Sequence, residues 1–239
     1  MTESLLIEKC RNFDENFKRI TEEMDAAVLR SGRKPGAVTL LAATKTVETE
    51  VINHAIQRGL QAMGENRVQE YLSKYDALIK DGCIRHFIGR LQTNKVKYIV
   101  DKVSCIQSVD TVKLASEIAK ESRKREIVTD ILVEVNIGDE QSKGGIEAGK
   151  LDEFIDEIRG FSGIRIKGLM CIPPIAENPA ENCRSFSKMR QYYVDMASKK
   201  IDNVCMDTLS MGMSDDYIEA IEQGSTMVRI GSALFGRRV

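Results

Sequence analysis

The sequence predicts an α/β protein whose strands and helices alternate along the chain, and a closed (β/α)8 TIM barrel fits this alternation best. Short apolar runs bounded by turn residues alternate with charged stretches of helical periodicity. The runs are continuously apolar, as in "ILVEVN" at 131–136, which is typical of parallel strands covered on both faces. Eight such units and a length of 239 residues are ordinary for one barrel domain.

Hydrophobic periodicity places each element. An additional N-terminal helix is expected over residues 4–30, where apolar side chains recur every three or four positions until "SGRKPG" ends it. Strands are expected at residues 38–44, 60–63, 86–89, 103–107, 128–136, 165–172, 204–210 and 227–230. Helices are expected at residues 48–58, 67–80, 94–101, 110–124, 147–159, 179–199 and 215–223, with a last helical turn at "SALFG".

This alternation does not by itself show that the sheet closes. A doubly wound open sheet has the same order of elements and is the alternative architecture. The sequence contains no low-complexity tract, linker or short internal repeat, so we expect a single domain over residues 1–239.

Composition excludes several classes of protein. Lys and Arg total 35 against 36 acidic residues, which gives no electrostatic reason to expect nucleic acid or an anionic membrane as a partner. The basic stretch "KESRKR" at 120–125 fits a solvated helix end. Early charges and the lack of a long apolar run predict a cytoplasmic protein. The cysteines form no CxxC pair, and His54 and His86 have no metal-ligand spacing, so we expect structural histidines and no metal.

In a barrel of this kind, the active site lies at the carboxyl ends of the strands. Lys45 follows the first strand, Asn66 follows the second, and Asn136 ends the fifth. The polar residues after the strands include no acid–histidine–nucleophile set, which argues against a triad hydrolase.

Two segments near the end of the sequence favour an anion site. Ser214 precedes "DDYIEAIE" at an expected helix N-cap, and Gly231 with Ser232 opens the turn "SALFG". Helix N-termini offer unpaired N–H groups to anions, and barrels often hold a phosphate after strands 7 and 8. Either segment alone would be an ordinary turn, but the two together, opposite a strand-end lysine, predict a phosphate site.

Lys45 could carry covalent chemistry at this mouth. Partial burial and a nearby cation such as Arg229 would favour the neutral amine, which can attack an aldehyde. A strand-end lysine alone is more often a solvated charge or a member of a salt bridge. Combined with the predicted phosphate site, it indicates a phosphorylated aldehyde, and pyridoxal 5'-phosphate fits.

The chain resembles the pyridoxal-phosphate homeostasis protein family, single-domain relatives of the alanine racemase N-terminal barrel. The resemblance runs from about residue 38 onward and lies in "LLAATKTV", "GENRVQE", "HFIGRLQTNK", "SMGMSDDYIEAI" and "GSTMVRIGSALFGRR". It implies that Lys45 forms the internal aldimine with pyridoxal phosphate and that Asn66 lies near the cofactor. It also implies that Arg229 faces the pyridine nitrogen, and that Lys143 falls where the racemase has an arginine near the phenolic oxygen.

The resemblance also assigns the phosphate loops. "SMGMS" and "RIGS" match the family's phosphate-binding segments, which puts Met211, Ser214, Gly231 and Ser232 at the phosphate. Relatives commonly have an aromatic residue in place of Arg67 and a tryptophan in place of Arg85, so surface and partner contacts are expected to differ.

The function implied is to hold pyridoxal phosphate and hand it on, with apo-enzymes that depend on it as candidate recipients, without robust catalysis. An arginine opposite the pyridine nitrogen disfavours ring protonation and weakens the ring as an electron sink. In the racemase the second acid–base group is a tyrosine from an additional domain that also supports its dimer, and this sequence ends at "FGRRV", so we expect a monomer. The alternatives are a weak amino-acid racemase and a cofactor-free class I aldolase-like enzyme.

Overall fold

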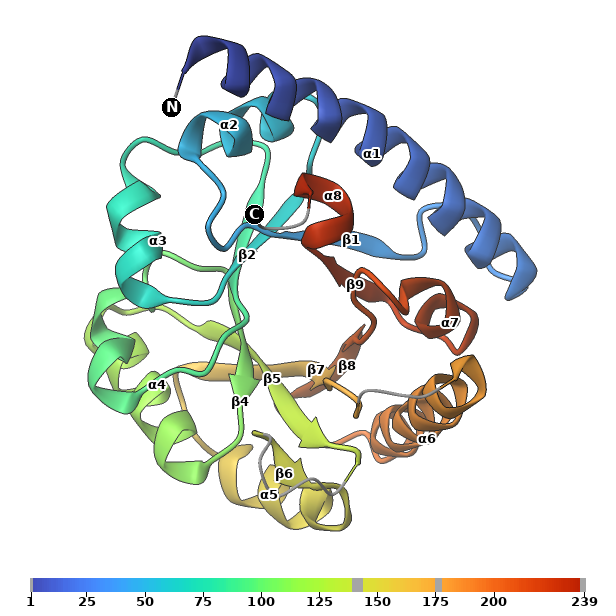
Figure 1. Cartoon of the computed structure of the whole chain (residues 1–239). Helices are drawn as coiled ribbons and strands as arrows, with labels where there is room; N and C mark the ends of the chain where they lie inside the picture. Colours follow the sequence, from blue (N-terminus) through green and yellow to red (C-terminus); the bar gives the residue numbers. More distant parts are fainter. Residues whose placement is uncertain (1, 139–143, 175–177, 237–239) are drawn as a thin grey trace.

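The computed structural model describes residues 2–138, 144–174 and 178–236, and within them eight parallel strands close into a barrel (Figure 1). Each strand pairs in parallel with its neighbours, β1 pairs with β9, and β4 pairs with β5. The closed barrel is therefore confirmed and the open sheet is wrong. The barrel strands are β1 Thr39–Ala43, β2 Ala62–Glu65, β3 Ile84–Phe87, β4 Cys105–Val109, β5 Thr129–Asn136, β7 Ile164–Met170, β8 Val204–Ser210 and β9 Met227–Ile230.

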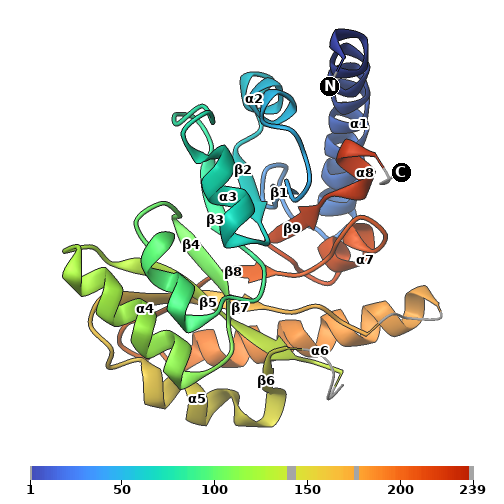
Figure 2. The ribbon, with the colours of Figure 1, turned by 60° about the vertical axis from the view of Figure 1, so that its left-hand side comes forward.

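Helices cover the outside of this barrel (Figure 2). They are α1 Glu3–Arg30, α2 Thr49–Gln57, α3 Val68–Tyr75, α4 Val112–Lys124, α5 Leu151–Ile158, α6 Pro179–Ser198, α7 Tyr217–Glu222 and α8 Ser232–Phe235. Two 3₁₀ segments, η1 Thr93–Tyr98 and η2 Ala148–Lys150, and the short strand β6 Ile146–Glu147 complete the described elements. Helix α1 lies along the outside against α2, α7 and α8, and buries Phe13, Ile20 and Met24 there.

The predicted strands lie within two residues of the observed ones. Three predicted helices differ in kind or length, and the one predicted at 147–159 begins only at Leu151, after β6 and η2. The helix predicted at 94–101 is instead the 3₁₀ segment η1 Thr93–Tyr98, after which the Ile99 N–H donates to the Val96 carbonyl three residues earlier. Helix α3 ends at Tyr75 because the Asn53 amide captures the backbone beyond it, donating to the Ala77 carbonyl at 2.9 Å and accepting from the Ile79 N–H at 2.8 Å.

Side chains alternate between two cores, as the pleat of a strand requires. The larger core lies between the strands and the helices and includes Phe87, Ile106 and Val133. Smaller groups line the barrel interior, with Leu41, Ala62 and Met227 in one and Cys105, Leu132 and Met170 in the other. Buried apolar side chains therefore fill part of the barrel interior.

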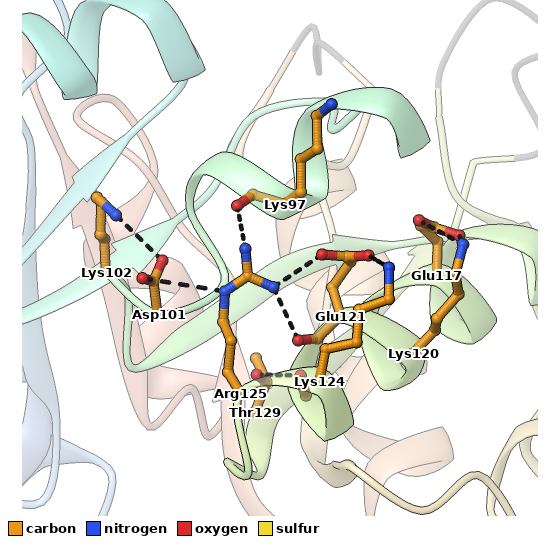
Figure 3. Close-up of polar contacts among 10 residues, drawn as sticks. Lys97, Asp101, Lys102, Glu117, Lys120, Glu121, Lys124, Arg125 and Thr129 are labelled. Carbon is orange, nitrogen blue, oxygen red and sulfur yellow. Dashed lines mark hydrogen bonds and ion pairs between the residues drawn. The ribbon is translucent and has the colours of Figure 1, made fainter.

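The basic stretch at 120–125 is neutralised by acids of its own helix (Figure 3). Lys120 pairs with Glu117 at 3.0 Å, while Lys124 and Arg125 both pair with Glu121, at 2.5 and 2.7 Å. These two cations lower the pKa of Glu121 to about 2. Arg125 also donates to the Lys97 carbonyl at 2.6 Å, which ties the end of α4 to η1.

Among the helices of the described residues, none combines the length and the apolar character needed to cross a bilayer.

The register between β7 and β8 depends on Gly168. The pairing shifts between Ile166 and Gly168, where Gly168 has φ of +148°, and a Cβ there would stand 1.8 Å from the Thr208 carbonyl oxygen. Replacing Gly168 by Ala should lower the free energy of unfolding, measured in urea, by on the order of 3 kcal/mol or more. Gly160→Ala is the matched control, because nothing lies within 4 Å of its Cβ position. Equal losses of stability for Gly168→Ala and Gly160→Ala would contradict this account of the register shift.

Candidate cofactor site

The pairing of β1 with β9 brings Lys45 and the last predicted loop to one edge of the barrel. Leu41 is in register with Arg229, and Ala42 with Ile230. A Cβ on Gly231 would stand 3.4 Å from both Cβ and O of Ala43, so the loop after β9 lies against the end of β1. Lys45 follows two residues later in an exposed turn. The structure therefore gathers Lys45, Arg229 and Gly231 at the carboxyl ends of neighbouring strands.

Arg229 is a buried cation inside the barrel mouth, with 5% of its surface exposed. Its Nη1 donates to Ser210 Oγ at 2.7 Å and its Nη2 to the Cys171 carbonyl at 2.9 Å. Burial lowers the pKa of the guanidinium, and the charge of Glu134 is among the groups that oppose this effect. A guanidinium has five N–H donors, so these two contacts leave donors for a ligand at the mouth.

Ser214 is tied to the start of α8 instead of capping α7. Its Oγ accepts from the Gly231 N–H at 3.2 Å and from the Ala233 N–H at 3.1 Å. The predicted N-cap at Ser214 is wrong, because α7 begins at Tyr217 with Asp216 as its N-cap. The Asp216 carboxylate accepts from the Met213 N–H at 2.5 Å. Ser214 and the N–H groups at the start of α8 nevertheless form one polar cluster, in which Gly231 lies two residues beyond Arg229 in the sequence.

The remaining predicted residues differ in how close they come to this cluster. Met211 has its side chain in the core outside the strands and its N–H bonded to the Met227 carbonyl, so only its main chain adjoins the mouth. Ser232 is exposed at the start of α8. Asn66 follows β2, and its Oδ1 is buried without a hydrogen-bond partner in the described residues. Lys143 lies outside the described residues.

A buried charge network supports the Lys45 turn from both sides, and the sequence analysis did not identify it. Lys74 Nζ donates to the carbonyl of Thr44 at 3.1 Å and pairs with Glu65 at 3.2 Å and Glu70 at 2.6 Å. Glu70 in turn accepts from the N–H of Thr46, which has a left-handed φ of +64°. The i,i+4 spacing of Glu70 and Lys74 was the available signal. The network therefore fixes the backbone on each side of the lysine.

Glu65 is the buried member of that network. Its side chain is 1% exposed, Thr44 Oγ1 donates to it at 2.8 Å, and its Oε2 has no partner in the described residues. Burial raises the pKa of Glu65, and the neighbouring Lys74 opposes this effect. The pairing with Lys74 is what makes this carboxyl tolerable under α3.

Glu134 is a second carboxyl that the sequence analysis did not identify, inside the apolar run "ILVEVN". It shares the register layer of Met170 and Ser210, and its Oε1 and the Oδ2 of Asp110 lie 3.5 and 3.6 Å from the position of a Cβ on Gly144. Burial and the charge of Asp110 raise the pKa of Glu134 to about 7, while Arg229 and Arg90 oppose the shift. A glutamate within an apolar strand was the signal that could have revealed it.

The two histidines lie in structural contacts. His54 bonds Asp14 at 2.9 Å on the outside, and His86 bonds Gln107 at 2.7 Å inside the barrel. Over residues 2–138, 144–174 and 178–236, no group of three or more His, Cys, Asp or Glu side chains is arranged to hold a metal ion.

Comparison with known folds places this barrel in one structural class. The family described as "Alanine racemase, N-terminal domain" matches residues 11–239. An alanine racemase from Clostridium difficile has the same fold, with a TM-score of 0.70 and 14% identity, and the match covers 95% of this chain and 57% of that one. The fold and its mouth thus define an alanine-racemase-type barrel.

Sequence comparison narrows the class to one family. A pyridoxal phosphate homeostasis protein of Aquifex aeolicus is 46% identical over 95% of this chain and 99% of its own length, and that of Escherichia coli K12 is 38% identical over 93% and 95%. PipY of Synechococcus elongatus, solved with pyridoxal phosphate bound, has a TM-score of 0.79 and 29% identity, covering 91% of this chain and 100% of its own. This chain belongs to the pyridoxal phosphate homeostasis protein family.

The network below the Lys45 turn makes a stability prediction. Lys74→Met removes the partner of a buried carboxylate and should lower the free energy of unfolding by about 3 kcal/mol, measured in urea. The double variant Lys74→Met/Glu65→Gln should recover part of this loss, because the unpaired charge is gone. Lys120→Met, which breaks an exposed i,i+3 pair, should change stability by only about 0.5 kcal/mol. A loss for Lys74→Met no larger than for Lys120→Met would contradict the network.

Glu134 makes a pH prediction. Its pKa is raised from 4.5 to about 7 in the folded protein, so folding favours the protonated form. The stabilising contribution is therefore full below about pH 4.5 and is lost as the pH rises through about 7. Urea unfolding at pH 5 and pH 8 should show the wild type losing stability relative to Glu134→Gln at the higher pH. A constant difference between the two proteins across this range would contradict the assignment.

Proposed function

We propose that this chain binds pyridoxal 5'-phosphate through a Schiff base at Lys45 and acts in pyridoxal-phosphate homeostasis by holding the cofactor and handing it on. The observation that carries the proposal is the β1–β9 pairing, which brings an exposed lysine, a buried arginine and a loop of N–H donors together. Membership of a family in which PipY binds this cofactor supports the same ligand here.

The residues at the mouth fit the functional groups of the cofactor. The phosphate suits the start of α8, where it would replace or join the Ser214 oxygen as acceptor of the Gly231 and Ala233 N–H groups and could accept the Ser214 hydroxyl proton. The acceptor nitrogen of the pyridine ring suits the remaining donors of Arg229. The aldehyde suits the amine of Lys45, and a ligand hydroxyl would supply the donor that the buried Asn66 Oδ1 lacks.

The position of Arg229 supports a binding role over broad carbanion chemistry. Bound pyridoxal phosphate supplies a reactive aldehyde and an electron-accepting ring. A buried, permanently charged guanidinium facing the ring nitrogen disfavours a proton there and weakens the ring as an electron sink. The competing proposal is weak amino-acid racemase activity, which would have to work with that weaker electron sink.

The exposure of Lys45 supports release of the cofactor. Stable covalent intermediates in enzymes depend on the exclusion of water from the site. Lys45 lies in an exposed turn, so water and a second protein can both reach the bond it would form. Apo-enzymes that depend on pyridoxal phosphate are therefore the recipients we propose.

The covalent bond is tested by reductive trapping. Protein loaded with pyridoxal phosphate should be yellow, and after borohydride reduction peptide mapping should find the adduct on Lys45. Lys45→Ala should lose both the colour and the adduct. Lys120→Ala, an exposed lysine of α4, should keep both. An adduct on a different lysine, or none in the wild type, would sink the proposal.

Delivery is tested against catalysis. Loaded protein should pass its cofactor to an apo-enzyme faster than it releases cofactor into buffer, and the rate should increase with apo-enzyme concentration. Incubation with single L-amino acids should yield D-isomer far more slowly than about 1 per second, the lower end of ordinary enzyme turnover. Turnover at that rate would reject the binding role, and a transfer rate independent of apo-enzyme would reject direct delivery.

A further inference from the structure

A chain of buried hydrogen bonds crosses the barrel interior from Arg229 to His86. Arg229 Nη1 donates to Ser210 Oγ, Ser210 Oγ donates to Gln107 Oε1, and Gln107 Nε2 meets His86 Nδ1, each at 2.7 Å. The four residues come from β9, β8, β4 and β3, and all are buried. Because β4 and β8 are not neighbours, the bond between Gln107 and Ser210 spans the interior and does not run along the wall.

The Gln107 amide sets the direction of these hydrogen bonds, because its nitrogen contacts both His86 and the Met227 sulfur, at 2.7 and 3.1 Å, and its oxygen faces Ser210. A guanidinium donates and never accepts, so the Ser210 oxygen accepts from Arg229 and its own proton points to Gln107. The Gln107 oxygen is then turned to Ser210 and its amide nitrogen to His86. His86 Nδ1 must therefore be an acceptor, which puts the proton of a neutral imidazole on Nε2. Burial lowers the pKa of His86 to about 4, against the charge of Asp130, which agrees with a neutral ring.

Four hydrogen-bonded polar side chains are unusual inside a small barrel. Small barrels are normally filled by apolar residues, and the neighbouring interior groups include Leu41, Leu132 and Met170. A buried polar group destabilises the fold unless it is hydrogen-bonded. Each bond in the chain orients the next: His86 turns the amide, the amide turns the Ser210 proton away from Arg229, and the serine lone pair receives the guanidinium. His86, at the other end of these hydrogen bonds, therefore influences how the Arg229 side chain is oriented.

We propose that His86, Gln107 and Ser210 are positioning residues that hold the Arg229 guanidinium with its remaining donors toward the mouth, so that the site selects a ligand whose ring nitrogen carries no substituent or proton. The inference rests on the proposed function for the identity of the ligand. The hydrogen-bond chain itself involves only residues of this protein, so it can be tested without any ligand.

The first experiment determines the histidine tautomer in ligand-free protein. Long-range ¹H–¹⁵N correlation spectra distinguish a protonated ring nitrogen from an acceptor nitrogen. The chain has only two histidines, so a His54→Gln variant assigns the His86 signals. At pH 7 we expect His86 to be neutral, with its proton on Nε2. A proton on Nδ1, or on both nitrogens, would overturn the chain whatever the ligand turns out to be.

The second experiment measures selectivity for the ring nitrogen. Dissociation constants are compared for pyridoxal 5'-phosphate and its N-methylpyridinium analogue, whose ring nitrogen carries a methyl group and a fixed positive charge. The wild type should bind the analogue at least about tenfold more weakly, since like charges placed together cost several kcal/mol. In Gln107→Leu and in Ser210→Ala this ratio should fall by at least about threefold, because the guanidinium is no longer held in place.

The control removes a buried hydroxyl elsewhere. Ser122→Ala deletes the 2.7 Å bond between Ser122 and Thr129 at the outer end of α4, where Figure 3 shows Thr129, and should leave the ratio unchanged. The hydrogen-bond chain is interrupted at two different residues, so the test still works if one of the two variants fails to fold. An unchanged ratio in a folded Gln107→Leu or Ser210→Ala variant overturns the positioning role. If the wild type binds neither compound, the proposed function is overturned and the proposed selectivity with it. The His86 tautomer measured in ligand-free protein still shows whether the hydrogen-bond chain exists.

Discussion

The parallel pairing of β1 with β9 is the contact on which the rest of the structure depends. It joins the first and last strands of the barrel and closes a sheet that would otherwise have two open edges. The same pairing sets Lys45, near the start of the chain, beside Arg229 and Gly231, near its end. Closure of the fold and assembly of the site are therefore one event, which couples stability to ligand binding.

The mouth holds several buried or half-buried charged groups, each stabilised differently. Lys74 and Glu65 neutralise each other under the Lys45 turn, whereas Glu134 is kept partly protonated by burial and by Asp110. Arg229 remains a cation and is satisfied by the oxygens of Ser210 and Cys171. Burying a fixed positive charge in this way lowers stability, and in the proposed complex that charge lies opposite the ring nitrogen. That placement would suit the role we propose, in which the cofactor is held and handed on.

The barrel and the position of its mouth could be predicted from the sequence. Parallel strands covered on both faces are continuous apolar runs, and their carboxyl ends lie at one edge of the sheet. That logic placed Lys45 and the loop after β9 correctly at the mouth. The sequence pattern could not predict contacts that form only when the barrel closes. Gln107 bonds Ser210 because β4 and β8 face each other across the barrel interior. Glu134 was not predicted as a site residue because its neighbours in the strand sequence are apolar. The cap predicted at Ser214 was wrong because Asp216 stands directly before α7.

The most direct test of the account is a crystal structure of the protein soaked with pyridoxal 5'-phosphate. We predict continuous electron density from Lys45 Nζ to the cofactor, with the phosphate on the N–H groups of the Gly231 loop and an Arg229 nitrogen facing the ring nitrogen. Cofactor joined to another lysine, bound outside the barrel mouth, or turned so that its phosphate meets Arg229 would contradict it.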